Sequence, residues 1–474
     1  MAQNSLSGLI PRGSLGLKLL LVCLLVLAMG VPLLTVGAIV AERQNRATQV
    51  TGEIGSRAGG EQVVGGPMLL VPYRRAVEVT DDQNRVQRRT VEGQYIIFAK
   101  TGAAETELSV DERRRGIYRA ATYGAVTDFH AEFDPAAALS GVDSSYQFDW
   151  SGARIVMFVR DSRAIRDAAE LRFSDGATAT LEPLSDLSIN APQPIDSAPD
   201  YSRSSYVDPA PLAGLQAFAA PAPLRGGPTP FTVDTRLSLG GAQRFALAAF
   251  AQDTTATIRG DRRDVSVQGF FQSSEAAEPD AEGFSAAWRV PFVARGIEKA
   301  ADLASFNLGT AAGRDMAVSF VASDDVYRGV MRAVQYGIMF IGIVFLATLI
   351  FEAVSGKRAH PAQYILVGLA QCVFYLLLLS ITELIGFTPA FALAAGATVL
   401  LLAYYAGVSF KSQAVGLRAL FALALLYGAM YVLMTLEDFA LFAGSVVAFV
   451  VIAATMIATR RIDWYGRGAA ATTE

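Results

Sequence analysis

The pattern of apolar and polar positions divides the chain into two strongly apolar tracts and a mixed region between them. The first tract, Leu15–Val40, exceeds the about 7–15 apolar residues of a signal peptide and reaches the about 20 that cross a bilayer. It predicts a transmembrane helix over residues 15–40, which Pro32 should kink locally. Small residues near Ala38 leave cleavage after this helix as an alternative.

The second tract, residues 333–459, predicts a bundle of five transmembrane helices. Turn and polar residues divide the tract into segments of about 20 residues, each long enough to cross the membrane. The expected helices are Val334–Val354, Tyr364–Ile385, Thr388–Gly407, Leu417–Leu436 and Phe439–Thr459.

The positions of lysine and arginine predict the orientation, because short loops rich in these residues stay in the cytoplasm. All the cationic flanks fall on one side of the expected topology: Arg12, Lys18, Lys357, Arg358, Lys411, Arg418, Arg460, Arg461 and Arg467. The opposite turns, Gly386-Phe387 and Glu437-Asp438, contain neither residue type. We therefore expect both termini, residues 1–14 and 460–474, in the cytoplasm and residues 41–332 outside it.

The mixed region, residues 41–332, predicts a large soluble domain made mainly of β-strands. Apolar and polar residues alternate in Met68–Tyr73, Tyr95–Lys100, Ile155–Arg160, Phe231–Leu239, Val265–Phe271, Ala286–Val293 and Ala317–Ala322. Helical periodicity is scarce apart from Ser162–Glu170, so the pattern favours an all-β, sandwich-like domain. Dense prolines at about residues 190–230 predict a connection without regular strand pairing.

Composition narrows the chemistry of this domain. The net charge of −4 and the absence of a basic stripe argue against a nucleic-acid partner. Both cysteines, Cys23 and Cys372, lie in apolar tracts, and the only histidines are His130 and His360. A disulfide framework, a metal site or a Ser-His-acid triad therefore lacks the residues it needs, and the common nucleotide-binding and hydrolase motifs are absent. We expect no catalytic residue, no metal and no cofactor.

Carboxylates near the helix ends are the remaining candidates for function, because a charge at the membrane requires a partner. Glu383, Glu437 and Asp438 are assigned to the outer face, where they could form an acidic cluster. Its expected basic partners, Arg328 and Arg332, belong to the edge of the soluble domain. The alternative is that these carboxylates lie at the interface, within reach of water.

Four further polar residues belong to the expected helices. Glu352 ends a helix on the cytoplasmic side, and Tyr375, Tyr427 and Tyr431 place hydroxyl groups inside the bundle. Tyr427 and Tyr431 are four residues apart and share a helix face. We expect these tyrosines to form hydrogen bonds between helices.

Several dispersed segments resemble the CreD family of bacterial inner-membrane proteins. They are Gly66–Tyr73, Gly283–Trp288, Arg332–Ile341, His360–Leu369, Phe374–Ser380, Leu436–Leu441 and Thr459–Tyr465, in this order along nearly the whole chain. The resemblance implies a multi-pass protein of the bacterial inner (cytoplasmic) membrane with a periplasmic domain. It also implies a role in cell-envelope integrity, linked to envelope stress, two-component signalling and the β-lactam response. It supplies no catalytic residues.

Our leading hypothesis is a non-enzymatic protein in contact with membrane lipids, whose periplasmic β domain binds an envelope component or a protein partner. One alternative is a small-molecule or lipid transporter that uses the C-terminal bundle. Another is a periplasmic or intramembrane hydrolase that acts on peptidoglycan or lipid through two carboxylates. Nothing in the carboxylate spacing selects such a pair.

Overall fold

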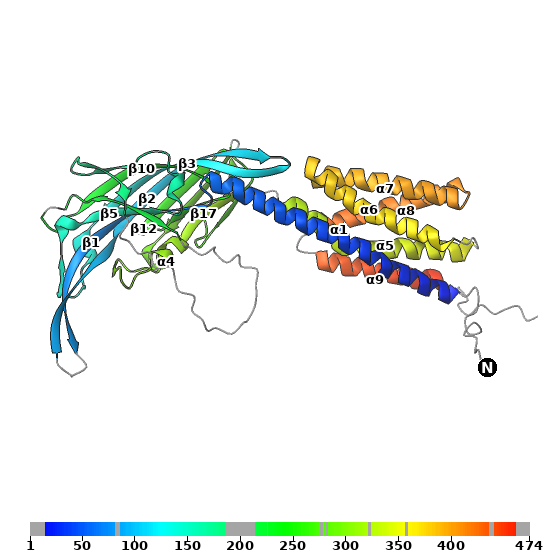
Figure 1. Cartoon of the computed structure of the whole chain (residues 1–474), viewed down its shortest axis with the longest axis horizontal. Coiled ribbons are helices and arrows are strands. Elements are labelled where there is room, and N and C mark those ends of the chain that lie inside the picture. Colours follow the sequence, from blue (N-terminus) through cyan, green and yellow to red (C-terminus); the bar gives the residue numbers. More distant parts are fainter. Residues whose placement is uncertain are drawn as a thin grey trace, which may run out of the picture. The chain divides into compact units, whose positions relative to one another are not determined.

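The computed structural model describes residues 15–80, 86–184, 214–224, 226–274, 278–280, 283–320, 324–355, 359–435 and 440–460. The chain forms two compact units (Figure 1). Met1–Gln49 and Ser323–Glu474 form the helical unit, and Val50–Ala322 form the β unit. The predicted fold class, with an N-terminal helix, a central β-rich domain and a C-terminal bundle, is confirmed.

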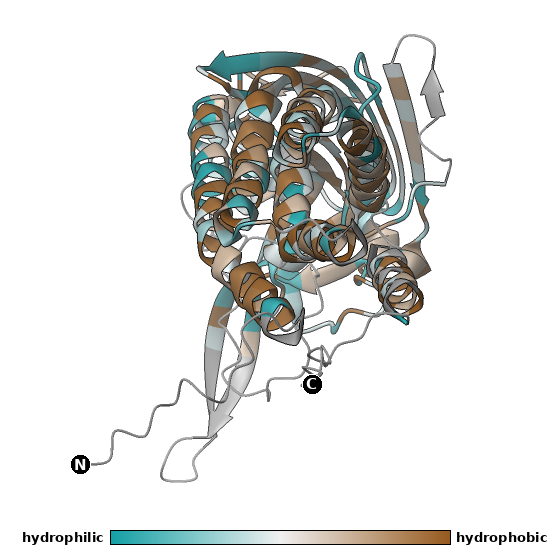
Figure 2. Cartoon of the chain, turned by 90° about the vertical axis from the view of Figure 1, so that its right-hand side faces the viewer, coloured by the Kyte–Doolittle hydropathy of each residue, from teal (hydrophilic) through white to brown (hydrophobic). Residues whose placement is uncertain are grey.

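The long helices are α1 (Leu15–Arg57), α5 (Asp324–Ser355), α6 (Pro361–Ile385), α7 (Phe387–Ser409), α8 (Gln413–Thr435) and α9 (Ala440–Thr459). Helices α1 and α5 to α8 are long and apolar enough to cross a membrane, and the described apolar part of α9, Gly444–Ile457, is shorter. Figure 2 shows hydrophobic residues along these helices. Buried residues of α1, Val22 and Met29, pack with Ile341 and Phe345 of α5 and Cys372 of α6, so α1 is part of the bundle core.

Two helices begin or end well beyond the predicted bounds. Helix α1 extends past Val40 to Arg57, and α5 begins at Asp324, inside the range predicted for the soluble domain. The predicted bounds rest on hydropathy, which shows where a helix is apolar but not where the helix begins or ends. Between Ala41 and Arg57 the residues are mostly polar but compatible with a helix, so the helix continues where the apolar tract ends.

The strands of the β unit are β1 (Gln62–Thr80), β2 (Val86–Arg115), β3 (Tyr118–Phe133), β4 (Tyr146–Phe148), β5 (Arg154–Val159), β6 (Glu170–Phe173), β7 (Thr178–Thr180), β8 (Glu182–Pro183), β9 (Gln216–Pro221), β10 (Phe231–Ala242), β11 (Arg244–Ala248), β12 (Ala251–Gly260), β13 (Val265–Gly269), β14 (Glu278–Asp280), β15 (Gly283–Val290), β16 (Ala300–Asp302) and β17 (Asp315–Phe320). In the described part of this unit, the connections include the short helices α2 (Pro135–Ala138), α3 (Phe292–Arg295) and α4 (Leu308–Gly313).

These strands form two sheets that share β2. In sheet A, β1 pairs with β5, with β11 and with residues 86–98 of β2, and the sheet continues through β9 and β17. In sheet B, residues 101–115 of β2 pair with β3, followed by β10 and β6, while β12 and β15 lie on the other side of β2. The chain also passes from sheet B to sheet A between β10 and β11, where Gln243 has a φ of 65°.

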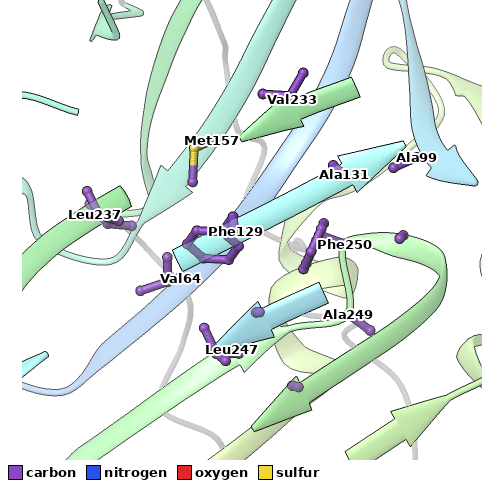
Figure 3. Packing of buried hydrophobic residues seen from close by; sticks show 14 of the residues in the cluster. Val64, Ala99, Phe129, Ala131, Met157, Val233, Leu237, Leu247, Ala249 and Phe250 are labelled. Carbon is purple, nitrogen blue, oxygen red and sulfur yellow. The ribbon is translucent and has the colours of Figure 1, made fainter. Parts of the chain in front are cut away.

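The main core lies between the two sheets (Figure 3). Strand β1 places neighbouring side chains on opposite faces, and its register against β5 shifts between Gly65 and Met68. Val64 and Leu69 therefore both enter this core, while Val63 and Met68 enter a second cluster. In the main core Phe129 of β3 packs its ring 5.5 Å from Phe250. The second cluster includes residues of α4, so sheet A is covered on both faces.

Two local predictions are wrong. The stretch Ser162–Glu170 is helical only at Ser162–Ala164, a single 3-10 turn that the Asp161 carboxylate caps by accepting a hydrogen bond from the Arg163 amide at 2.9 Å. It ends there because Ile165 pairs with Leu239 of β10. Within the proline-rich range 190–230, strand β9 pairs with β5 despite the predicted absence of regular pairing. At Pro221, the last residue of β9, the strand pairs with β5 alone, and such edge positions tolerate proline. Residues 190–213 of this range lie outside the described residues.

Candidate functional site

The outer face of sheet B carries a polar groove that follows from strand periodicity. Along β3, Val126, Asp128, His130 and Glu132 alternate with buried residues and therefore point away from the core. The strand register continues this polar face onto the neighbouring strands. Asp128 lies between Glu105 of β2 and Arg236 of β10, and His130 lies opposite Asp234 of β10.

Two close charge pairs cross this face. Arg236 donates hydrogen bonds to both carboxylate oxygens of Asp128, at 2.7 Å from Nε and 2.9 Å from Nη2, and this bonding raises the pKa of Arg236. His130 Nδ1 lies 2.6 Å from Oδ1 of Asp234, and its Nε2 lies 3.8 Å from Oε1 of Glu132. Both ring nitrogens face carboxylates, so neither is placed to activate a nucleophile as a catalytic triad requires.

A cavity of about 540 Å³ opens on this face, and residues 167–170 form one of its walls. A smaller cavity of about 190 Å³ shares Glu105, Asp128 and Arg236 with it, so the two form one surface, the sheet B groove. Its larger part is lined by the carboxylates Glu105, Asp128, Asp167, Glu170 and Asp234 and by the bases His130, Arg172 and Arg236.

The charges in the larger part of the sheet B groove do not balance. Once the pairs that Asp128 and Asp234 form are set aside, three carboxylates, those of Glu105, Asp167 and Glu170, share one cation there, Arg172. The smaller part adds one charge of each sign, Glu107 and Arg259, so the excess of carboxylates remains. This excess of acceptors suits a ligand that carries ammonium and hydroxyl groups. Among the described residues, no group of three or more histidine, cysteine, aspartate or glutamate side chains is arranged to hold a metal ion.

In the helical unit, Glu352 belongs to a buried polar cluster. Its carboxylate is 6% exposed and accepts hydrogen bonds from Lys18 Nζ of α1 and, at 3.2 Å, from the Tyr364 hydroxyl of α6. Lys18 also donates to the Ala359 carbonyl at 3.3 Å. A buried carboxylate is stable only with such partners. In the sequence Lys18 is only an orientation signal, because no local pattern connects it with Glu352, 334 residues further along the chain.

The predicted outer acidic cluster is described only at Glu383. The Tyr327 hydroxyl donates to Oε1 of Glu383 at 3.1 Å, and Arg43 Nη1 of α1 lies 4.0 Å from the same oxygen. Glu437 and Asp438 lie outside the described residues, so the cluster remains a prediction.

The two predicted basic partners belong to α5 in the helical unit, which corrects their assignment to the edge of the soluble domain. Arg332 Nη1 donates to the Met434 carbonyl near the end of α8, at 3.0 Å, and Arg328 is exposed.

The three bundle tyrosines lie on α6 and α8. The Tyr375 hydroxyl is 4.0 Å from the Met430 sulfur of α8, and the Tyr431 hydroxyl is 3.2 Å from the Thr388 hydroxyl of α7. Tyr427 packs its ring against Phe374, with the ring centroids 5.0 Å apart. The Phe374 ring also contacts that of Tyr375, with the centroids 4.9 Å apart, so these residues stabilise contacts between helices.

Comparison with known proteins gives one extensive match. The sequence fits the family described as CreD, inner membrane protein CreD, over residues 14–465. Inner membrane protein CreD of Escherichia coli strain K12 is 25% identical over 451 residues, which covers 93% of this chain and 91% of that protein. Among solved structures, a Parabacteroides distasonis protein described as a “putative protease” covers 58% of this chain and 50% of its own at 9% identity. Its TM-score of 0.22 is too low for any argument about fold or function.

Proposed function

Because the chain belongs to the CreD family of inner membrane proteins, we propose that it supports cell-envelope integrity from the inner membrane and does so without catalysing a reaction. In this proposal the helical unit anchors the protein as a multi-pass membrane protein. The β unit lies in the periplasm and binds an envelope component.

The sheet B groove is the observation that carries this proposal. It combines unbalanced carboxylates with a histidine whose two ring nitrogens both face acids, which suits binding rather than catalysis. An envelope polymer with hydroxyl and ammonium groups matches these acceptors. Peptidoglycan has this chemistry in its sugars and in its stem peptides, so we propose it as the ligand.

The periplasmic location of the β unit is supported by the charges of the helical unit. Lys18, Lys411, Arg418 and Arg460 lie at helix ends that an alternating topology places on one side of the membrane, and such cationic ends stay in the cytoplasm. The β unit follows α1 and precedes α5, at the opposite ends of these helices.

The test is co-sedimentation of the purified full-length protein, in detergent, with isolated peptidoglycan. The double variant Glu105→Gln/Asp167→Asn removes two groove carboxylates that have no ion pair within the described residues. We expect binding to weaken by about threefold for each carboxylate, because exposed charge pairs contribute little individually. We also expect wild-type binding to fall as salt rises.

A matched control removes the same charge elsewhere. Glu182 on β8 of sheet A and Glu298, just before β16 of the same sheet, are exposed and form no ion pair within the described residues, like the two groove carboxylates. The variant Glu182→Gln/Glu298→Gln should sediment as the wild type does. Equal losses in both double variants, or no sedimentation of the wild-type protein, would refute the groove as the peptidoglycan site.

The role in the cell is tested by complementation. A strain without the gene should become more sensitive to detergent and to β-lactams, and the wild-type gene should restore resistance. The groove variant should restore less than the control variant at equal protein levels. Unchanged sensitivity of the deletion strain would contradict the proposed role in envelope integrity and in the β-lactam response.

A further inference from the structure

The helical unit contains a second cavity of about 600 Å³, distinct from the sheet B groove in place and in chemistry. Helices α5 to α9 all contribute to its lining. The lining residues that lie away from the cytoplasmic ends proposed for these helices are aliphatic and include Ile343 of α5, Leu426 and Ala429 of α8, and Val446 of α9. A cavity with such walls offers water few hydrogen-bond partners, so it favours an apolar occupant.

One end of this cavity is polar. Thr348 and Phe351 lie near the end of α5, Gln363 near the start of α6, Ser409 at the end of α7 and Arg418 near the start of α8. These helix ends lie together, because the ring of Phe351 is 4.9 Å from that of Phe410, which directly follows α7. The cavity therefore has an apolar interior and a polar mouth.

Arg418 supplies the charge of this mouth. Among the described lining residues it is the only charged one, and its side chain is exposed. The nearby carboxylate of Glu352 is engaged by Lys18 and Tyr364, so it leaves the mouth positively charged. A guanidinium at the rim of an apolar cavity in a membrane bundle matches an anionic lipid, with the phosphate outside and the acyl chain inside.

We propose that this cavity binds an anionic phospholipid, with an acyl chain between α5, α8 and α9 and the headgroup phosphate on Arg418. The volume lies within the range of about 300–1,000 Å³ that is typical of small-molecule sites in proteins. The lipid fills the cavity between α5, α8 and α9 and completes the bundle there. This site is independent of the peptidoglycan site proposed for the β unit.

The test uses the purified full-length protein, delipidated in detergent and then exposed to phosphatidylglycerol or phosphatidylcholine of equal chain length. Native mass spectrometry counts the bound lipids, and titration gives their affinities. The wild-type protein should bind one phosphatidylglycerol in preference to phosphatidylcholine. Arg418→Gln should reduce this preference by about fivefold, the effect of one basic residue at a membrane surface.

Further variants distinguish the binding of the acyl chain from the effect of the Arg418 charge. Ala422→Phe places a ring in the cavity and should abolish the tight binding of both lipids, whereas Ala424→Phe, on an exposed α8 position outside the cavity, should not. Arg460→Gln removes an exposed arginine at the end of α9 that does not line the cavity, and it should keep the preference. Equal behaviour of Ala422→Phe and Ala424→Phe would overturn the site. Equal behaviour of Arg418→Gln and Arg460→Gln would overturn the role of Arg418.

Discussion

Replacement of Arg295 by methionine should stabilise the β unit, which is unusual for the removal of a fully buried side chain. Arg295 has no exposed surface, and neither terminal nitrogen of its guanidinium has a hydrogen-bond partner among the described residues. Its Nε donates to the Ala249 carbonyl at 3.1 Å, and its Cζ lies 3.8 Å from the centroid of the Phe98 ring. These two contacts only partly compensate for the loss of water around the charge.

The pKa of Arg295 gives the magnitude of this penalty. Burial, with a smaller effect of the nearby Arg314, lowers the pKa from the ordinary 12.5 to about 9. That shift corresponds to about 5 kcal/mol against the charged form in the folded protein. The contact with Phe98 returns about 2 kcal/mol and the hydrogen bond to Ala249 about 1 kcal/mol, and a methionine loses both. Arg295→Met should therefore stabilise the β unit by about 2 kcal/mol.

Thermal unfolding of the purified protein in detergent measures this effect. For a unit of this size we expect the midpoint to rise by about 4 °C at pH 7. The advantage of the variant should be constant up to about pH 8. Above pH 9 the folded wild-type protein loses the Arg295 proton before the unfolded chain does, so its penalty shrinks and the two midpoints should converge.

Two controls make the result specific. Arg289→Met changes an exposed arginine of β15 and should shift the midpoint only slightly. Arg295→Lys keeps a buried charge but replaces the planar group with a more strongly hydrated ammonium, so it should destabilise the unit. A lower midpoint for Arg295→Met at pH 7, or a gap that stays constant above pH 9, would show that the guanidinium has a favourable partner and would refute this reasoning.

Three other substitutions test packing and charge. Gly65→Ala would place its Cβ 2.1 Å from the Phe158 ring, so we expect a loss of about 3 kcal/mol in thermal unfolding, and a wild-type midpoint would contradict this packing. Lys18→Met leaves the Glu352 carboxylate buried without its cation, so it should lower the melting point of the helical unit in detergent. Adding Glu352→Gln to this variant removes the unpaired charge and should restore part of the lost melting point. Burial and the hydrogen bond to Asp302 raise the pKa of Tyr73. The stability that the neutral phenol contributes below pH 10 should therefore be lost as the pH rises further. Tyr73→Phe has no group to ionise there, so its melting point should fall less at alkaline pH than that of the wild type.

Elements with a strong local pattern could be predicted from the sequence. The predicted helix Tyr364–Ile385 lies within α6, and the predicted strand Met68–Tyr73 lies within β1. The first is a continuous apolar tract long enough to cross a membrane, and the second is a short apolar run that is almost wholly buried, so in both the residue types alone indicate the surroundings. The continuation of β2 from sheet A into sheet B could not be predicted, because the strand does not end where it changes partners.

The residues of the sheet B groove were only partly predictable. Alternation along β3 was sufficient to place Asp128 and His130 on one face, and a systematic search for charged residues at every second position would have found this face. Their pairing with Arg236 and Asp234 depends on the register of β3 against β10, which is set by tertiary structure. The burial of Arg295 could not be predicted, because its local sequence does not reveal which side chains surround it in the fold.

Two charged residues of α1 form specific contacts with the bundle that the hydropathy of the N-terminal tract does not predict. Lys18 contacts Glu352 at the end of α5, and Arg43 lies 4.0 Å from Glu383 near the end of α6. The 25 residues from Lys18 to Arg43 span about 37 Å of helix, which matches a bilayer with its interfacial regions. The two contacts join α1 to α5 at one end of its apolar tract and to α6 at the other, so together they fix the register of α1 against the bundle. An apolar helix of equal length without these two charges could slide along α5 and α6. The N-terminal tract is therefore a specific component of the bundle as well as an anchor.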